Sequence, residues 1–277
     1  MKIQCKTLKN GFAIPMVGKG TWMTDIAGKP RPTLNDEKRI EEIKEAIAAG
    51  ISYIDTAERY TNGYGEILIG KAIKGLNREK LFLASKVSSD HLRYDSVISS
   101  AKSSLKRLQT SYLDLYLIHQ FNPDLPLQET MRAMDYLIEK KMIKYIGVCN
   151  FTAEQLQEAQ SHTKNKIVAN QLRYNFLHRE LEQTGIIEYC QKHDIVVIAC
   201  RPFQLESLSL KIKAQLEEMA SKYTKTPAQI AAAWLMLQTN IVVLSKLKTI
   251  SQIEKIVEAS QIKMDGKDAA LFIIKNN

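Results

Sequence analysis

The chain has 277 residues, of which 45% are hydrophobic and 25% charged, the balance of an ordinary globular protein. Its first five residues lack the apolar core of a secretion signal, and its longest apolar stretches, such as 230–237, are too short to cross a bilayer. The net charge of +9 is spread along the chain without long basic runs, which argues against nucleic acid as a partner. We therefore expect a cytoplasmic protein that binds neither membranes nor nucleic acid.

The excess positive charge would also attract a small anion such as a phosphorylated cofactor, although a solvated lysine-rich surface is the simpler explanation. The four cysteines have neither the spacing of metal ligands nor the density of a disulfide scaffold; they are Cys5, Cys149, Cys190 and Cys200. We expect reduced thiols and no metal site.

A hairpin is predicted at the beginning of the chain, because Asn10-Gly11 separates two strand-like runs. Short apolar or β-branched runs then alternate with amphipathic helical stretches almost to the end, which is typical of a parallel sheet built from βα units. Eight candidate strands can be counted, at 18–21, 52–55, 81–86, 114–119, 144–149, 167–171, 196–200 and 241–244.

The first helix is predicted to begin at Asp36, and we expect Asp36 to be its N-cap residue. Ile40, Ile43 and Ile47 share one face of this helix, and Gly50 is expected to stop it.

Later helices have clearer starts. Three threonine–glutamine pairs have the spacing of a capping box, namely Thr152 with Gln155, Thr226 with Gln229, and Thr249 with Gln252. Pro227 also stands at a first helical position. Segments 172–180 and 201–211 are predicted loops, and no Pro- or Gly-rich linker divides the chain. We expect one α/β domain over 1–277, a (β/α)₈ barrel whose bottom is closed by the hairpin.

In such barrels the active site lies at the carboxyl ends of the strands. Four ionisable residues lie at or just after these ends: Asp55, Tyr60, Lys86 and His119. Each alone has an ordinary explanation, since aspartates cap helices, lysines are solvated and loop tyrosines usually pack. Their common position at one face favours a shared chemical role.

The four residues suit a proton-donating device. An ammonium such as Lys86 favours the phenolate of a neighbouring tyrosine and so makes Tyr60 a better acid. Asp55 would hold Lys86 in place and keep it charged, while His119 would orient a substrate carbonyl. No serine or cysteine paired with a base is visible, which disfavours hydrolysis.

Motifs along almost the whole chain resemble the aldo-keto reductases. They are Leu8-Lys9-Asn10-Gly11, Gly18-Lys19-Gly20-Thr21-Trp22, Asp55-Thr56-Ala57-Glu58-Arg59-Tyr60, Gly65-Glu66, Gly70-Lys71-Ala72, Ser85-Lys86, Leu117-Ile118-His119, Ile146-Gly147-Val148-Cys149-Asn150-Phe151, Asn170-Gln171, Tyr174-Asn175, Thr226-Pro227-Ala228-Gln229 and Ser245-Lys246. The resemblance implies reduction of aldehydes or ketones to alcohols by hydride from NADPH, with NADH also possible.

Residue roles follow from the same resemblance. It makes Asp55, Tyr60, Lys86 and His119 the catalytic tetrad, with Tyr60 the proton donor. It places the substrate between Trp22, Tyr60 and His119. The cofactor would contact Gly20, Thr21, Asp55, Asn150, Gln171, Arg201, Ser245, Lys246, Lys248 and Gln252, with Asn150 and Gln171 on the nicotinamide carboxamide. The resemblance also implies a monomer.

Four positions depart from the family pattern, among them Arg201, which stands where a serine is usual. Cys149 replaces a usual serine, and a thiol is a poor hydrogen-bond donor. Cys200 replaces the tyrosine that stacks on the nicotinamide. Gln252 replaces an arginine that holds the 2′-phosphate, and Lys246 and Lys248, beside the predicted helix start at Thr249, are expected to compensate. Two ordinary surface lysines would be the preferred explanation if the rest of the chain did not match.

Two other functions stay open at this point. The barrel could bind the nucleotide and serve as a regulatory or interaction subunit, because a fold can be kept while its function changes. It could also be a different barrel enzyme, a hydrolase or an aldolase with a Schiff base on Lys86, but this leaves Tyr60 and His119 without a role.

Overall fold

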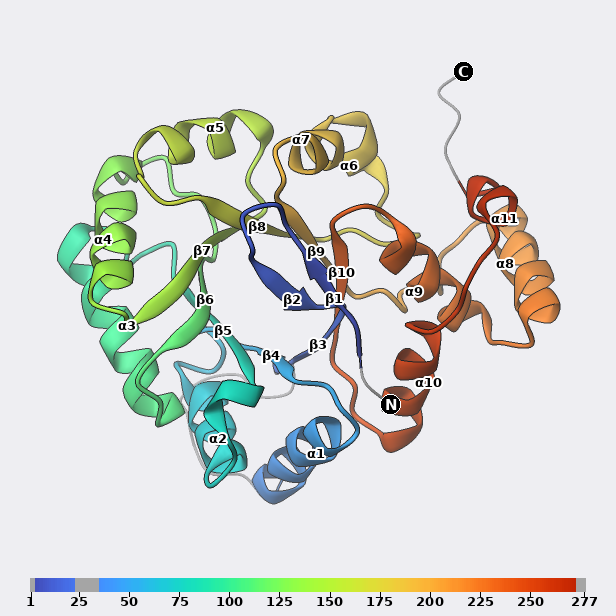
Figure 1. Cartoon of the computed structure of the whole chain (residues 1–277), viewed down its shortest axis with the longest axis horizontal. Helices are drawn as coiled ribbons and strands as arrows, with labels where there is room; N and C mark the ends of the chain where they lie inside the picture. Colours follow the sequence, from blue (N-terminus) through green and yellow to red (C-terminus); the bar gives the residue numbers. More distant parts are fainter. Residues whose placement is uncertain (1–2, 23–34, 273–277) are drawn as a thin grey trace.

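The computed structural model describes residues 3–22 and 35–272. Eight parallel strands close into a barrel in the order β10-β3-β4-β5-β6-β7-β8-β9 (Figure 1). The strands are β3 (Val17–Gly20), β4 (Tyr53–Asp55), β5 (Phe82–Val87), β6 (Leu113–Ile118), β7 (Ile143–Cys149), β8 (Ile167–Leu172), β9 (Val196–Cys200) and β10 (Ile241–Ser245). The predicted barrel is confirmed, and no predicted strand end is wrong by more than one residue.

Helices surround the strands on the outside, as Figure 1 shows. They are α1 (Asp36–Ala48), α2 (Tyr64–Ile73), α3 (Tyr94–Leu108), α4 (Leu127–Glu139), α5 (Ala153–Ser161), α6 (Glu180–Gln183), α7 (Ile186–Lys192), α8 (Leu210–Tyr223), α9 (Pro227–Leu237), α10 (Ile250–Ala259) and α11 (Gly266–Ala270), with a 3₁₀ turn at Arg78–Lys80. Each long helix turns an apolar stripe inward; in α3, Val97, Ala101 and Leu108 are buried at this spacing. Among the described helices, none is both long and apolar enough to cross a membrane.

The hairpin of β1 (Cys5–Thr7) and β2 (Ala13–Pro15) crosses the centre of the barrel in Figure 1. Gly11 takes φ +87° at its turn, a conformation that favours glycine. Phe12 is fully buried, and its ring packs edge-on against Phe82 and Tyr145, with centroids 6.1 and 4.7 Å away. Both partners lie near the amino ends of their strands, so the hairpin closes the bottom of the barrel, as predicted.

Two of the three predicted capping boxes are confirmed. At Thr152 and again at Thr226, the hydroxyl accepts a hydrogen bond from the glutamine backbone and the glutamine side chain accepts one from the threonine backbone. The third box is incomplete: Thr249 Oγ1 accepts from Gln252 N at 3.2 Å, but Gln252 Oε1 accepts from Lys248 N instead, at 2.8 Å. Gln252 therefore shapes the loop before α10.

The predicted cap at Asp36 is wrong. Asn35 is the N-cap residue, and Asp36 is the first residue of α1. The Asp36 carboxyl accepts a hydrogen bond from the Tyr64 hydroxyl at the start of α2, so a contact between helices has taken the side chain away from its own backbone. The helix does stop as predicted, with Gly50 at φ +99°. The loop after β9 is slightly shorter than predicted, because Ser209 accepts a hydrogen bond from Ile212 N and caps α8.

Candidate active site

The four predicted catalytic residues gather at the carboxyl end of the barrel. Asp55 is the last residue of β4, Lys86 lies near the end of β5, and His119 directly follows β6. Tyr60 comes from the loop between β4 and α2. The parallel register pairs Asp55 with Ala84, so Lys86, two residues farther along β5, lies just beyond the end of β4, and its side chain contacts Asp55.

Asp55 and Lys86 form an ion pair with no exposed side-chain surface. Lys86 Nζ lies 2.6 Å from Asp55 Oδ1 and also donates to the Thr56 carbonyl at 2.6 Å. Asp55 Oδ2 accepts weaker bonds from Gln171 Nε2 at 3.3 Å and from the Tyr53 hydroxyl at 3.4 Å. Burial works to lower the pKa of Lys86, but the adjacent carboxylate raises it above its ordinary value. Lys86 is therefore held as an ammonium.

Tyr60 is a weaker acid than predicted. Burial raises the pKa of its phenol to about 12, although the Lys86 ammonium works to lower it. Lys86 Nζ lies 5.1 Å from the centroid of the Tyr60 ring. Lys86 thus acts in the predicted direction, but the removal of the phenolate from water has the larger effect.

His119 lies beside Tyr60 and is neutral. Their rings meet edge to face, with centroids 5.4 Å apart. Burial, together with the charges of Lys86 and Arg59, lowers the pKa of His119 to about 3. Its Nδ1 atom is buried and has no hydrogen-bond partner among the described residues. A neutral imidazole can donate one hydrogen bond without carrying charge.

Tyr60 and His119 both line a cavity of about 290 Å³. It is lined by Trp22, Tyr60, His119, Cys149, Asn150, Gln171, Leu172, Arg173, Cys200, Arg201 and Leu244. The Trp22 ring lies against the backbone of Gly20, where an added Cβ would stand 2.0 Å from it, so only glycine allows this packing. The structure thus brings most predicted substrate and nicotinamide residues together, and it adds Arg173, for which the sequence carried no motif.

Several predicted cofactor residues have specific local contacts. Cys149 is buried and its thiol donates to Gln171 Oε1 at 3.4 Å, so it points at a neighbouring amide. Asn150 and Arg201 are exposed and take left-handed conformations, with φ +56° and +58°. Thr21 Oγ1 donates to the Asp55 carbonyl at 3.0 Å and joins β3 to β4.

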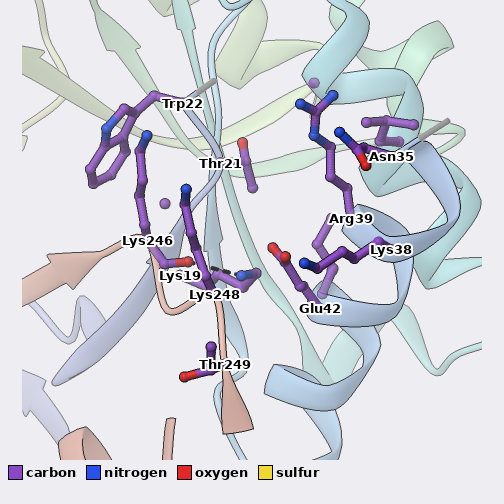
Figure 2. Close-up of a pocket in the computed structure, with 14 residues that line it drawn as sticks. Lys19, Thr21, Trp22, Asn35, Lys38, Arg39, Glu42, Lys246, Lys248 and Thr249 are labelled. Carbon is purple, nitrogen blue, oxygen red and sulfur yellow. Dashed lines mark hydrogen bonds between the residues drawn. The ribbon is translucent and has the colours of Figure 1, made fainter. Parts of the chain in front are cut away.

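A second cavity, of about 330 Å³, lies between α1 and the loop that joins β10 to α10. Figure 2 shows Lys19, Lys246 and Lys248 on one side and Lys38, Arg39 and Glu42 of α1 on the other. The Lys246 ammonium lies 5.5 Å from the Trp22 ring centroid, and Trp22 lines both cavities. Ser245 is buried beside this loop, whereas Gln252 does not line the cavity.

Lys19, Lys38 and Arg39 line this cavity but were not among the cofactor residues predicted from the sequence. The available signal was a charged residue, Lys19, between two glycines in a barrel strand, where apolar residues are usual. In the part of the chain that the structure describes, no group of three potential metal ligands is close enough to hold an ion, and none of the four cysteines forms a disulfide.

Comparison with known proteins agrees with this arrangement. The model of the aldo/keto reductase family matches residues 16–275. Methylglyoxal reductase YeaE of Escherichia coli K12 is 31% identical over 265 residues, which cover 94% of this chain and 90% of that protein. No comparison supports a regulatory or interaction subunit.

Solved structures show the same likeness. The thermostable aldo-keto reductase Tm1743, solved with the inhibitor epalrestat, is 41% identical with a TM-score of 0.92 over 98% of both chains. An aldo-keto reductase of Klebsiella pneumoniae, solved with NADPH, is 29% identical with a TM-score of 0.84, over 98% of this chain and 94% of that one. The motifs, the closed barrel and these matches agree: the chain belongs to the aldo/keto reductase family and is an oxidoreductase.

Proposed function

We propose that this oxidoreductase reduces small aldehydes or ketones to alcohols with NADPH, and that Tyr60 supplies the proton. The observation that carries the proposal is the cavity beside the Asp55–Lys86 pair, which Tyr60 and His119 both line. A carbonyl oxygen in this cavity would lie among a phenol, a neutral imidazole and a nearby ammonium. The NADPH bound to the Klebsiella relative supports the choice of cofactor.

The residues present fit such a cofactor. When bound, NADPH supplies the hydride. Asn150 and Gln171 would hold the carboxamide; Gln171 Oε1 accepts one bond from Cys149 and has a second lone pair to offer. Ser245, Lys246 and Lys248, at the amino end of α10, would hold phosphate, because helix N-termini and lysines attract anions. Gly20, Thr21 and Arg201 would complete the site, and Gln252, which does not line the cavity, would act by fixing Lys248 N.

The proton step remains favourable despite the weak acidity of Tyr60. A carbonyl that accepts hydride becomes an alkoxide, whose conjugate acid is about as weak an acid as water and weaker than a phenol. A phenol whose pKa is about 12 still gives up its proton to such a base. Lys86 then lies 5.1 Å from the phenolate ring and stabilises its charge, while His119 donates a hydrogen bond that orients the oxygen.

For the substrate, a small 2-oxoaldehyde is the first compound to try. YeaE, at 31% identity, is named a methylglyoxal reductase. A cavity of about 290 Å³ easily holds a molecule of that size.

Replacing Tyr60 with Phe tests the proposal. Turnover, followed as the loss of NADPH absorbance with methylglyoxal or another reactive aldehyde, should fall about 100-fold or more, the contribution of a positioned general acid. The dissociation constant for NADPH, measured by fluorescence, should stay near wild type. Turnover within about threefold of wild type would show that Tyr60 is not the donor. A wild-type protein that quenches NADPH fluorescence without turnover would favour a binding module.

We further propose that the chain folds as one domain and acts as a cytoplasmic monomer. The exposed large apolar side chains among the described residues are scattered over separate elements; they are Leu76, Leu210, Leu237, Ile250 and Leu271. Sedimentation should therefore give one species of 31.5 kDa, and urea should give one unfolding transition. A dimer peak or two transitions would contradict this, and cell fractionation would test the location.

A further inference from the structure

Lys19 is a buried lysine without a role in the chemistry described above. It lies on β3, with only 3% of its surface exposed, and its side chain reaches across to the loop between β10 and α10. There its Nζ donates to the carbonyl of Lys246 at 2.9 Å and to that of Leu247 at 2.7 Å. Two consecutive carbonyls of one loop are thus held by one ammonium.

The loop that Lys19 holds has an unusual backbone. Leu247 takes φ +47°, a left-handed conformation that leucine rarely adopts and that surrounding contacts must maintain. The Leu247 side chain is buried, and Lys248 N is fixed by Gln252 Oε1 at 2.8 Å. With Leu247 turned inward, both Lys246 and Lys248 line the cavity in Figure 2.

Lys19 also adds positive charge to this cavity, which it lines. Among the described residues, no carboxylate lies within ion-pair distance of its ammonium. Burial lowers the pKa of Lys19 to about 8; Glu42 and Glu45 of α1 oppose this effect and Lys248 adds to it. Lys38 and Arg39 of α1 and Lys246 of the loop also line the cavity. An anion bound here would therefore favour the charged form of Lys19.

We propose that Lys19 is a positioning residue for the phosphate end of the cofactor, which fixes the 246–248 loop so that Lys246 and Lys248 face a 2′-phosphate. This inference rests on the proposed function, because it needs NADPH to occupy the cavity. It assigns part of the discrimination between NADPH and NADH to a residue on β3, at the opposite end of the chain from the phosphate loop.

The first test compares Lys19→Met with a matched control. Burial lowers the pKa of Lys6 as well, and its ammonium donates to one backbone carbonyl, that of Gln238 at 3.1 Å, but Lys6 lies on the hairpin at the bottom of the barrel. Lys19→Met should weaken NADPH binding roughly tenfold, the effect of about one charge-assisted contact, and NADH binding by less than about threefold. Lys6→Met should change neither.

The second test needs no variant. Because a bound phosphate raises the pKa of Lys19 from about 8, NADPH binding near pH 8 should take up as much as about half a proton, and NADH binding less. Calorimetry in two buffers of different ionisation enthalpy measures this uptake. In wild type, NADPH affinity should also fall relative to NADH affinity as the pH rises through 8, and this trend should be absent in Lys19→Met.

The outcomes separate the two proposals. If Lys246→Ala weakens NADPH selectively but Lys19→Met does not, and the proton uptake is equal for both cofactors, Lys19 has no positioning role. If wild type binds NADPH and NADH equally and Lys246→Ala changes neither, the proposed phosphate site itself is wrong. Equal losses for both cofactors in Lys19→Met would make Lys19 merely structural.

Discussion

The barrel holds two buried lysines in two different settings. At the centre, Lys86 is paired with Asp55 at 2.6 Å and its pKa is raised. In the second cavity, beside α1, Lys19 has backbone carbonyls as its partners, and its pKa is lowered to about 8. Both side chains are removed from water to almost the same degree.

The difference shows what a full charge provides that carbonyl dipoles do not. A carboxylate compensates the burial of an ammonium, so Lys86 keeps a fixed charge over the working pH range. Two carbonyls hold Lys19 in place but leave its protonation open to change. The barrel centre around Lys86 is therefore suited to a constant electrostatic environment. The second cavity is suited to a charge on Lys19 that responds to a bound ligand.

Breaking the central pair should have the largest effect. Lys86→Met leaves Asp55 buried without its counter-ion, and we expect the free energy of unfolding in urea to fall by about 3–5 kcal/mol, with turnover almost lost. Asp55→Asn should harm turnover less. In the double variant the destabilisation should be about 2 kcal/mol smaller than the sum of the two single effects, because both remove the same pair.

An exposed ion pair provides the control for this cycle. Lys44 lies 3.9 Å from Glu41 on α1, with at least half of each side chain exposed, and Lys44→Met should leave the urea midpoint close to wild type. Additive losses in the Lys86 and Asp55 double variant would mean that the two residues stabilise the barrel separately.

The neutrality of His119 predicts a loss of stability in mild acid. Its folded pKa of about 3 lies below the unfolded value of 6.5, so the unfolded state binds more protons as the pH falls. The contribution is fully present above pH 6.5 and is lost progressively toward pH 3. Between pH 6.5 and 5, the loss should be about 2 kcal/mol. Urea titrations of wild type and His119→Asn measure it; the difference between the two proteins should change with pH by that amount.

The low pKa of His119 should also determine how turnover depends on pH. No protonation of His119 should limit kcat between pH 5 and 7, because the folded imidazole is already neutral there. A fall in kcat below about pH 6.5 that disappears in His119→Asn would show that the pKa of His119 is not lowered.

Substitutions in the second cavity should have smaller effects, on cofactor affinity, and these effects should depend on salt. We expect NADPH to bind roughly ten- to a hundredfold more tightly than NADH, and Lys246→Ala to weaken NADPH alone. The preference should shrink between 50 mM and 500 mM salt, because partly exposed charges are screened. Dissociation constants for both cofactors at both salt concentrations would show this. A preference that does not change with salt would place the discrimination in a buried contact.

Replacing Gln252 with Arg should have the smallest effect. An arginine fork binds phosphate in a bidentate manner, so the preference for NADPH should rise a few-fold. The gain is limited because Gln252 Oε1 now fixes Lys248 N, and the variant loses that bond. A weaker preference would mean that holding the loop matters more than adding the charge.

The sequence by itself determined the barrel and the residues at its open end. Strands end where apolar runs end, and eight parallel runs can close in only a few ways, so Asp55, Lys86 and His119 had to meet at one face. The motif matches assigned the family from the same residues. Local signals such as the Thr152 and Thr226 boxes also held, because their partners lie three residues away.

Only the tertiary structure decided how those residues behave. The acidity of Tyr60 and the neutrality of His119 depend on how much water the packed barrel excludes, which no local pattern records. Asp36 left its predicted cap for Tyr64 of another helix, and Lys19 reached a loop 227 residues away. Burial and contacts between distant segments set these properties, because both arise only when the chain has closed on itself.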